Sequence, residues 1–385
     1  MDDKKYNENI NWTKYLLFGI LMFSSTMSFV AVFHVKIWYI SLFICALYFL
    51  RVGEFTIPKS IFLAFISIIL FASLINLNEF GIKRDFYNCI LGIGLVCISY
   101  TLVIELKIDK IEYILKWVAV LNALFVGINT LSQIEAIKEY LVYRKLDHPV
   151  LNTLSVGGTN LDATWLSIYC AVFYKSKYKW IFMLYSIAIN TIYAARVGYL
   201  INIFLICFFL YQDRKVLKKH IIKIIIGFAM FIPMIVNSVA FNMAISRFSG
   251  IGTSSDEGGM HRLLMWTAVP KVICEYPLGV GMGNTIIALN KVTGKIYRDG
   301  NYHNLVLEYF GTAGILGGIL FLIMLVFFAV SFIKMRNKMD SITLMLACYL
   351  VAGMVQFSGD ESIMFLLVGA FLGIQQIKRN IYMRE

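Results

Sequence analysis

Residues 259–318 read GMHRLLMWTAVPKVICEYPLGVGMGNTIIALNKVTGKIYRDGNYHNLVLEYFGTAGILGG. The stretch joins an arginine-bearing segment, a turn with glycine at every second position over 279–283, a His-Asn pair at 303–304 and the start of a long apolar run. The chain on either side is apolar enough to form membrane-spanning segments. We therefore expect residues 259–318 to supply part of a reactive site that the rest of the chain holds at a membrane surface.

The composition of the whole chain supports this expectation. Of 385 residues, 59% are hydrophobic and 15% are charged, whereas a soluble domain is about 45–50% apolar and about 25% charged. The net charge of +12 does not indicate a nucleic-acid partner, because the Lys and Arg residues lie in short clusters between apolar runs and form no recognisable basic module. The seven cysteines are scattered without a CxxC pair and are expected to be small apolar side chains.

The apolar runs predict an all-α membrane protein with about twelve transmembrane helices. A span needs about 20 mostly apolar residues, and residues 1–385 are expected to form a single polytopic membrane domain. The runs lie near 15–33, 35–50, 61–75, 86–104, 111–131, 161–174, 180–195, 197–211, 221–240, 304–333, 341–357 and 361–377.

The basic residues predict the orientation. If the N-terminus is cytoplasmic, the cytoplasmic segments carry 20 Lys and Arg residues and the short outer loops carry 4. Retention of positive loops in the cytoplasm produces such a bias. Both termini are therefore predicted to be cytoplasmic. Two long connections, 132–160 and 241–303, fall on the outer side, which is the periplasm in a bacterial inner membrane, and the second is expected to be a large helical loop.

Three arginines are candidates for binding an anion. Arg196 lies between two apolar runs with almost no loop, where a charge is costly unless it snorkels, pairs or faces water. Arg262 is expected near the start of a helix, where free backbone N–H groups also attract anions; the alternative is a solvated helix charge. Arg247 is a further cation of the same long connection and is expected to be solvated unless it replaces Arg262.

His303 and three neighbours complete the candidate site. An imidazole with a pKa near about 6.5 suits a general base at neutral pH, and His303 precedes a predicted span at the outer surface; the alternative is an interfacial histidine without chemistry. Asn304 beside it, and Asp360 and Glu361 in an outer turn, are candidates for substrate binding, although an exposed turn is the simpler interpretation of the acidic pair. The histidines show no HExxH or HxxxH spacing, so neither a metal nor another cofactor is expected.

The order of these features resembles the bacterial O-antigen polymerase and O-antigen ligase family. The resemblance rests on Arg196, the segment from Arg262 to Trp266, the Pro-Leu-Gly-Val-Gly turn at 277–281, His303-Asn304 and the glycines from Gly311 to Gly318. It is specific over about 190–320 and only topological elsewhere. It implies a polytopic glycosyltransferase of the C-type architecture.

The resemblance also implies a reaction. The family transfers a glycan from an undecaprenyl-diphosphate carrier to a sugar hydroxyl, with inversion and without a metal. By position, Arg196 and Arg262 would bind the diphosphate, and His303 would deprotonate the attacking hydroxyl. These roles fit general chemistry, because a diphosphate leaving group needs its developing charge stabilised and the hydroxyl needs a base within reach.

Three functions stay open at this point. A polymerase joins one lipid-linked repeat chain to another, and two sizeable outer loops favour it over a ligase, which attaches the chain to lipid A-core. A chain-length regulator is a possible protein partner of the polymerase. A flippase or other transporter is the alternative class; it would show internal repeats or charged residues at mid-membrane, whereas an enzyme would gather Arg196, Arg262 and His303 at one outer cavity.

Overall fold

The computed structural model describes residues 2–53, 55–58, 61–137, 152–155, 158–193, 195–214, 257–335 and 339–382. Within these ranges the regular structure is helical apart from one small antiparallel hairpin, formed by β1 (Ala31–Val32) and β2 (Val35–Lys36). The prediction of an all-α protein is therefore confirmed for the described part of the chain. Arg247 and the predicted span at 221–240 lie outside the described residues.

Eleven of the twelve predicted apolar runs coincide with helices. The first run was predicted too long: its helix ends at Thr26, because residues 27–36 turn and form the β-hairpin. The helices are α1 (Asp2–Thr26), α2 (Ile37–Val52), α3 (Ile61–Ile75), α4 (Leu77–Phe80), α5 (Arg84–Ile104), α6 (Ile108–Ser132), α8 (Thr159–Tyr169) with the 3₁₀ turn η1 (Cys170–Phe173), α9 (Lys179–Ile192), α10 (Arg196–Gln212), α13 (Glu257–Glu275), α14 (Thr285–Thr293), α15 (Leu305–Lys334), α16 (Ser341–Gly353) and α17 (Ser362–Tyr382).

Three of the described helices, α5, α6 and α15, are long and apolar enough to cross a membrane by length and composition. Shorter apolar helices, including α2, α9, α10 and α16, accompany them, and the total of twelve spans stays a prediction. Large apolar side chains are exposed on the outer faces of α6, α9 and α15. Such a surface is unfavourable in water and suits lipid acyl chains; it includes Leu124, Ile128, Leu131, Ile181, Leu184, Leu316, Ile323, Phe327 and Ile333.

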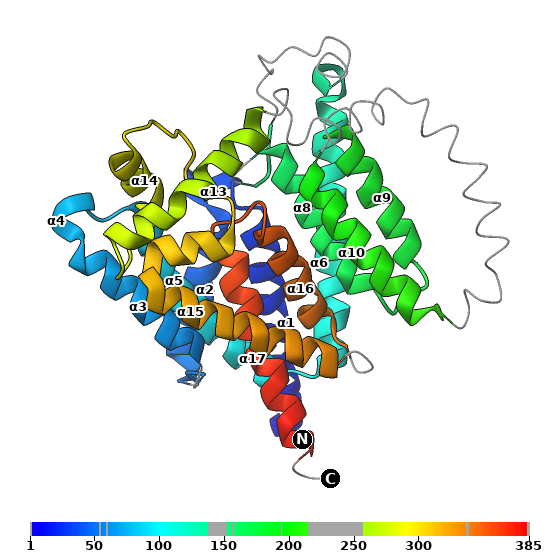
Figure 1. The fold of residues 1–385 in the computed structure, drawn as a ribbon. Helices are drawn as coiled ribbons and strands as arrows, with labels where there is room; N and C mark the ends of the chain where they lie inside the picture. The colour runs from blue at the N-terminus through cyan, green and yellow to red at the C-terminus, as the bar shows by residue number, and fades with distance from the viewer. Residues whose placement is uncertain are drawn as a thin grey trace.

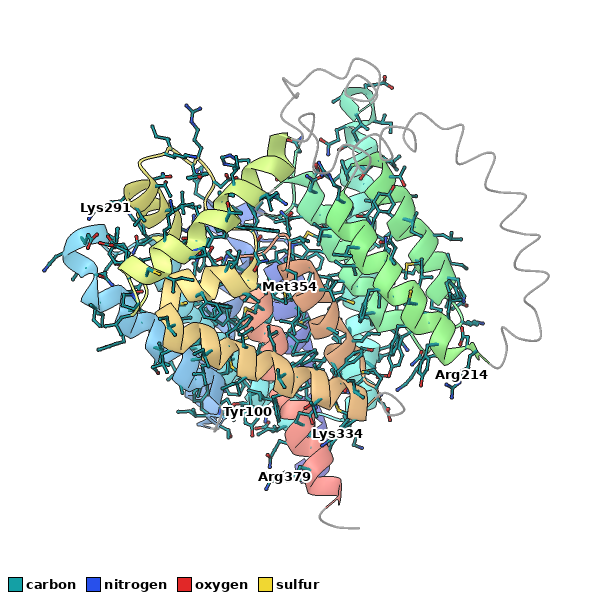
Figure 2. All side chains as sticks on the ribbon, viewed as in Figure 1. Tyr100, Arg214, Lys291, Lys334, Met354 and Arg379 are labelled. Atoms are coloured by element: carbon teal, nitrogen blue, oxygen red, sulfur yellow. The ribbon has the colours of Figure 1, made fainter. Side chains whose placement is uncertain are left out.

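The helices form one large bundle, with a smaller unit of α13 and α14 at the end away from the chain termini. α5 packs along α17, α15 packs on α3, α1 packs on α6, and α10 packs on α8 (Figure 1). The two chain ends lie together at the bottom of this view, whereas α13 and α14 lie at the top. Arg214, Lys334 and Arg379 lie toward the end that holds the termini, and Lys291 lies at the other end (Figure 2).

The 277–283 turn, with its alternating glycines, is hydrogen-bonded to α15 at a point where that helix is interrupted. Gly314 has φ 67° and ψ −165°, which interrupts the helix. The turn pairs with this break through backbone hydrogen bonds, from Val280 N to Gly311 O (3.0 Å) and from Ile315 N to Pro277 O (2.9 Å). Gly279 has φ 86°, and a Cβ there would lie 2.4 Å from the nitrogen of Gly314. The glycines thus allow two backbones to meet, which fixes the first part of α15 and the loop before it.

Candidate functional site

A cavity of about 380 Å³ lies where several helices begin or end. α1 ends at this cavity, and α2, α5, α15 and α17 begin there, so it lies at the end of the bundle opposite the chain termini. Its size is within the usual range of about 300–1,000 Å³ for small-molecule sites. The lining residues are Ser25, Ser28, Lys36, Trp38, Arg84, Asp85, Asn88, Leu161, Trp165, Met282, Gly283, Gly300, Asn301, His303, Glu308, Gln356, Phe357, Ser358, Asp360, Glu361 and Ser362.

His303 lines this cavity and is held by its neighbours in the chain. Its backbone is left-handed, with φ 54°, and its N–H donates to the side chain of Asn301 (2.7 Å). The indole N–H of Trp266 donates to the carbonyl of Tyr302 (2.7 Å). A non-glycine residue in this conformation is uncommon and persists where surrounding contacts fix it. The orientation of His303 is therefore imposed by the fold.

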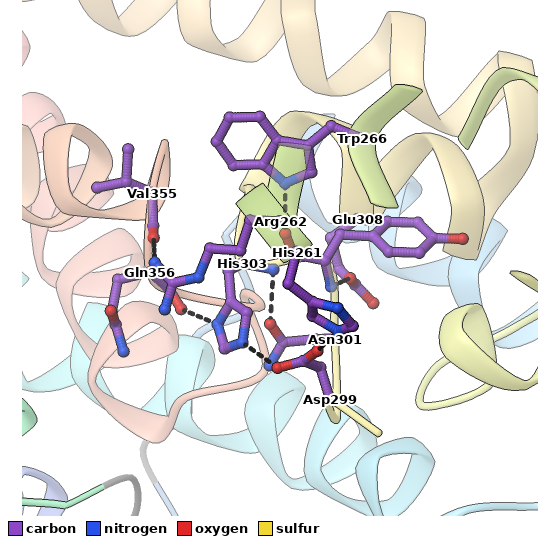
Figure 3. Close-up of polar contacts among 10 residues, drawn as sticks. His261, Arg262, Trp266, Asp299, Asn301, His303, Glu308, Val355 and Gln356 are labelled. Atoms are coloured by element: carbon purple, nitrogen blue, oxygen red, sulfur yellow. Dashed lines mark hydrogen bonds and ion pairs between the residues drawn. The ribbon is translucent and has the colours of Figure 1, made fainter. Parts of the chain in front are cut away.

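The His303 ring lies between α13, the 354–361 loop and Asp299 (Figure 3). Its Nδ1 is 3.3 Å from the carbonyl oxygen of Gln356, and its Nε2 is 3.4 Å from Oδ1 of Asp299. Burial lowers the pKa of His303, the nearby Arg262 lowers it further, and the contacts with Gln356 and Asp299 oppose this. The ring is therefore neutral at pH 7 and available to accept a proton.

Arg262 lies beside His303. It projects from α13, and its Nη1 donates to the carbonyl of Val355 (3.0 Å). The hydrogen bond places a permanent positive charge next to the general-base candidate at the edge of the cavity. Arg262 is half-buried and does not itself belong to the cavity lining.

Arg196 occupies a different place in the fold. It is the first residue of α10 and is half-buried. It is not among the residues that line the cavity. The structure therefore joins Arg262 with His303, and the role of Arg196 stays a prediction.

The three polar candidates beside His303 have separate environments. Asn304 caps α15 by accepting from Leu307 N (3.0 Å) and donates to Met354 O (2.9 Å), and it does not line the cavity. Asp360 and Glu361 do line it and are half-buried, so the interpretation as an exposed turn was wrong. Glu361 accepts from the Tyr349 hydroxyl (2.5 Å) and from two backbone N–H groups. Burial and the neighbouring Asp360 carboxylate raise the pKa of Glu361.

The sequence analysis missed the cations that line the cavity, Lys36 and Arg84. Both line the same cavity, and the pKa of Lys36 is lowered by burial and further by the Arg84 charge. Lys36 precedes α2 and Arg84 is the first residue of α5, both on the predicted outer side, where basic residues run against the positive-inside rule. The positive-inside rule, applied to each residue of the outer loops, would have pointed to Lys36 and Arg84.

The cavity also holds carboxylates that the sequence did not single out. Glu308 is buried and accepts from the Thr285 hydroxyl (2.8 Å) and from Tyr302 N (2.8 Å). Asp85 lies beside Asp360 and Arg84. In the part of the chain that the structure describes, no group of three or more His, Cys, Asp and Glu side chains has the arrangement of a metal site.

Comparison with known proteins gives one match to a protein family. Residues 163–322 match the family model described as O-antigen ligase. The matched region runs from α8 into α15 and contains Arg196, Arg262 and His303, whereas Lys36, Arg84 and Asp360 lie outside it. A search of curated proteins found no match.

Proposed function

Because residues 163–322 carry the domain of the O-antigen ligase family, we propose that this chain is a membrane glycosyltransferase acting on lipid-linked glycans. In the proposed reaction it is an O-antigen polymerase, which joins undecaprenyl-diphosphate-linked oligosaccharide repeat units with inversion. The observation that carries the proposal is the position of His303, which lines the cavity beside Arg262.

His303 is the proposed general base. Its ring is neutral at pH 7, because burial and Arg262 both lower its pKa. The acceptor hydroxyl transfers its proton to the ring as its oxygen attacks the anomeric carbon of the donor sugar. The bond from that carbon to the phosphate oxygen breaks, and its electron pair leaves with the diphosphate. General-base assistance of this kind contributes about 10²–10⁴-fold to a rate.

Fixed side-chain cations are proposed to stabilise the leaving diphosphate. Lys36 and Arg84 line the cavity, and Arg262 lies at its edge. Arg196 keeps its proposed role as a further diphosphate ligand, on the strength of the family resemblance. Oriented cations in a site sheltered from water can replace a divalent ion, so we expect a chelator such as EDTA to leave the transfer rate unchanged.

The proposed location is the bacterial inner membrane, with the termini cytoplasmic and the cavity periplasmic. The cavity and the termini lie at opposite ends of the bundle. Arg214, Lys334 and Arg379 lie toward the end of the termini, which agrees with the positive-inside rule. A donor with a polyprenyl tail in the bilayer and a glycan in water needs a site at such a surface.

A ligase is the second candidate, and the match to the O-antigen ligase family favours it. The two reactions share donor chemistry and differ in acceptor. The test is incubation of the purified full-length protein with lipid-linked repeat units alone. Elongated products without lipid A-core are expected for the polymerase, while products that form only after lipid A-core is added would identify a ligase. Transport of the lipid-linked unit with no glycosidic product in either mixture would identify a carrier and refute the proposal. A chain-length regulator would alter only the product length.

A further inference from the structure

Asp299 lies between two imidazole rings (Figure 3). Its Oδ2 is 2.6 Å from Nε2 of His261, and its Oδ1 is 3.4 Å from Nε2 of His303. The first contact has the length of a charge-assisted hydrogen bond, whereas the second is longer than the normal range. The Asp299 carboxylate thus connects His303, the proposed base, with His261, which lies on α13.

Both ring nitrogens of His303 face acceptors. Nδ1 faces the carbonyl oxygen of Gln356, and Nε2 faces Asp299. A neutral imidazole has one N–H and can satisfy only one of the two acceptors, while the imidazolium has two. The two hydrogen-bond partners of the ring therefore suit the protonated form, whereas burial and the Arg262 charge oppose it. A site that fits the charge formed during the reaction lowers the barrier.

His261 holds Asp299 in position. The His261 Nε2–H donates to the carboxylate, and its ring contacts Tyr297 with centroids 5.3 Å apart. The side chain of His261 is 38% exposed and that of His303 is 19% exposed. The Asp299 carboxylate therefore lies between the more solvent-exposed His261 ring and the more buried His303 ring. Without His261, Asp299 would be free to turn toward water, because it lies in a loop that precedes α15.

We propose that Asp299, held by His261, is a positioning residue that pairs with His303 and stabilises the imidazolium formed during glycosyl transfer. The neutral ring donates its Nε2–H to Asp299, and the acceptor hydroxyl reaches Nδ1 from the cavity in place of the Gln356 contact and transfers its proton there. The imidazolium then donates from Nε2 to Asp299 and, once the sugar has moved away, from Nδ1 to Gln356. After the product leaves, the proton passes to water and the neutral ring returns. This inference rests on the proposed function, since it assigns the partner of the same base.

The other charges around His303 set the direction of the pH effect. Arg262 on α13 opposes protonation of His303, whereas Asp299 favours it. The 354–361 loop presents the backbone oxygen of Gln356 to the ring. The remaining charged groups of the cavity are Lys36, Arg84, Asp85, Glu308, Asp360 and Glu361.

Kinetics of four variants test the pairing. Asp299→Asn should lower kcat by about 10²-fold and shift the acidic limb of kcat/KM to lower pH, because the carboxylate that favours the imidazolium is gone. His261→Leu should lower kcat by about tenfold, and His261→Gln, which restores an N–H donor, should recover most of that loss. The double variant Asp299→Asn with His261→Leu should be no slower than Asp299→Asn alone, because His261 acts through Asp299.

Glu79→Gln is the matched control, since Glu79 also pairs with a basic side chain (Lys291, 2.6 Å) but lies away from the cavity. Its rate and pH profile should equal those of the wild type. Two results would overturn the inference: an unshifted acidic limb in Asp299→Asn, or multiplicative losses in the double variant. If Asp299 had only a structural role, Asp299→Asn would reduce the amount of active enzyme without shifting the acidic limb of kcat/KM.

A titration that needs no turnover separates this inference from the proposed function. In full-length protein with ¹⁵N-labelled histidine in lipid nanodiscs, the signal lost in His303→Gln identifies His303. Its midpoint should move to lower pH in Asp299→Asn. If this shift occurs while the wild type transfers no glycan, the pairing stands and the proposed function fails. If the wild type transfers glycan and the midpoint does not move, the pairing alone is refuted.

Discussion

Two regions carry the arginines that the sequence marked, and they use polar side chains differently. The outer cap comprises α13, α14 and residues 295–304; the side bundle comprises α8, α9 and α10. In the side bundle, buried Ser167, Ser186 and Asn190 bond one another, with Asn190 Nδ2 at 2.8 Å from Ser167 Oγ. In the outer cap, Asp299 and the ring of His303 gather at the edge of the cavity instead.

The difference shows that a polar residue among apolar helices has two uses. Hydroxyl and amide groups that hydrogen-bond to one another, as Ser167, Ser186 and the Asn190 amide nitrogen do, join helices and contribute modestly to stability. A group such as the His303 ring faces two acceptors but has a second N–H only after it is protonated. Such a group is suited to acid–base chemistry. Arg262 belongs to the second kind of region, and Arg196 lies on the edge of the first.

The largest expected effect is loss of an arginine charge. Arg262→Gln and Arg196→Gln should each lower transfer by about 10²–10³-fold, or about 2.7–4.1 kcal/mol, if both stabilise the diphosphate. The pH dependence should separate them. Removing Arg262 raises the pKa of His303, because the charge that opposes protonation is lost. The acidic limb of kcat/KM should therefore move to higher pH in Arg262→Gln alone.

This shift is opposite in sign to the one expected for Asp299→Asn, so one pH series compares both partners of His303. If the acidic limb of kcat/KM moved equally in Arg196→Gln, Arg196 would lie beside His303. The outer cap and the side bundle would then not differ in the way described. An unchanged rate in Arg196→Gln would remove it from the proposed site.

The next effect concerns the turn that fixes the outer cap. Gly279→Ala should lower the free energy of unfolding by about 2 kcal/mol or more, because φ is 86° and the new Cβ would meet the backbone of Thr312 and Gly314. Gly294→Ala is the matched control, with φ 67° and no atom within 4 Å of the added carbon. It should cost about 1 kcal/mol from backbone strain alone. If denaturing-detergent titrations gave the same loss of unfolding free energy for Gly279→Ala and Gly294→Ala, the close backbone approach at Gly279 would be unimportant for stability.

The smallest effect is expected in the side bundle. Ser167→Ala removes a buried hydroxyl that contacts Ser186 and Asn190. It should lower stability by about 0.5–1 kcal/mol, which is typical of one polar contact between membrane helices. The transfer rate per folded molecule should stay at the wild-type value. A loss of rate without a loss of stability would assign this network to the reaction.

Much of the fold could be predicted from the sequence, because apolar runs of sufficient length become helices wherever their backbone groups must be satisfied internally. The turn at 277–283 was recognised from its alternating glycines. What it approaches, the break at Gly314, was not predicted, since the apolar pattern of α15 continues through the break. The early end of α1 was missed for the same reason, because the hairpin after it is also apolar.

The candidate site was predicted in part. Arg262 and His303 were found because they share one stretch of chain with a recognisable order of residues. Lys36, Arg84 and Glu308 were missed, because the site is assembled from helix ends that are distant in sequence. Asp299 was missed for another reason: an acidic residue in a loop has no distinguishing pattern until its two histidine partners are known.

A single-turnover experiment tests the central claim, that the His303 cavity performs glycosyl transfer from a lipid diphosphate. Purified wild-type protein and His303→Gln are mixed with lipid-linked repeat units, and both the bound donor and the released undecaprenyl diphosphate are measured. We predict that His303→Gln binds the donor as the wild type does and releases diphosphate more slowly by at least about 10²-fold. Release at the wild-type rate by His303→Gln would contradict the account.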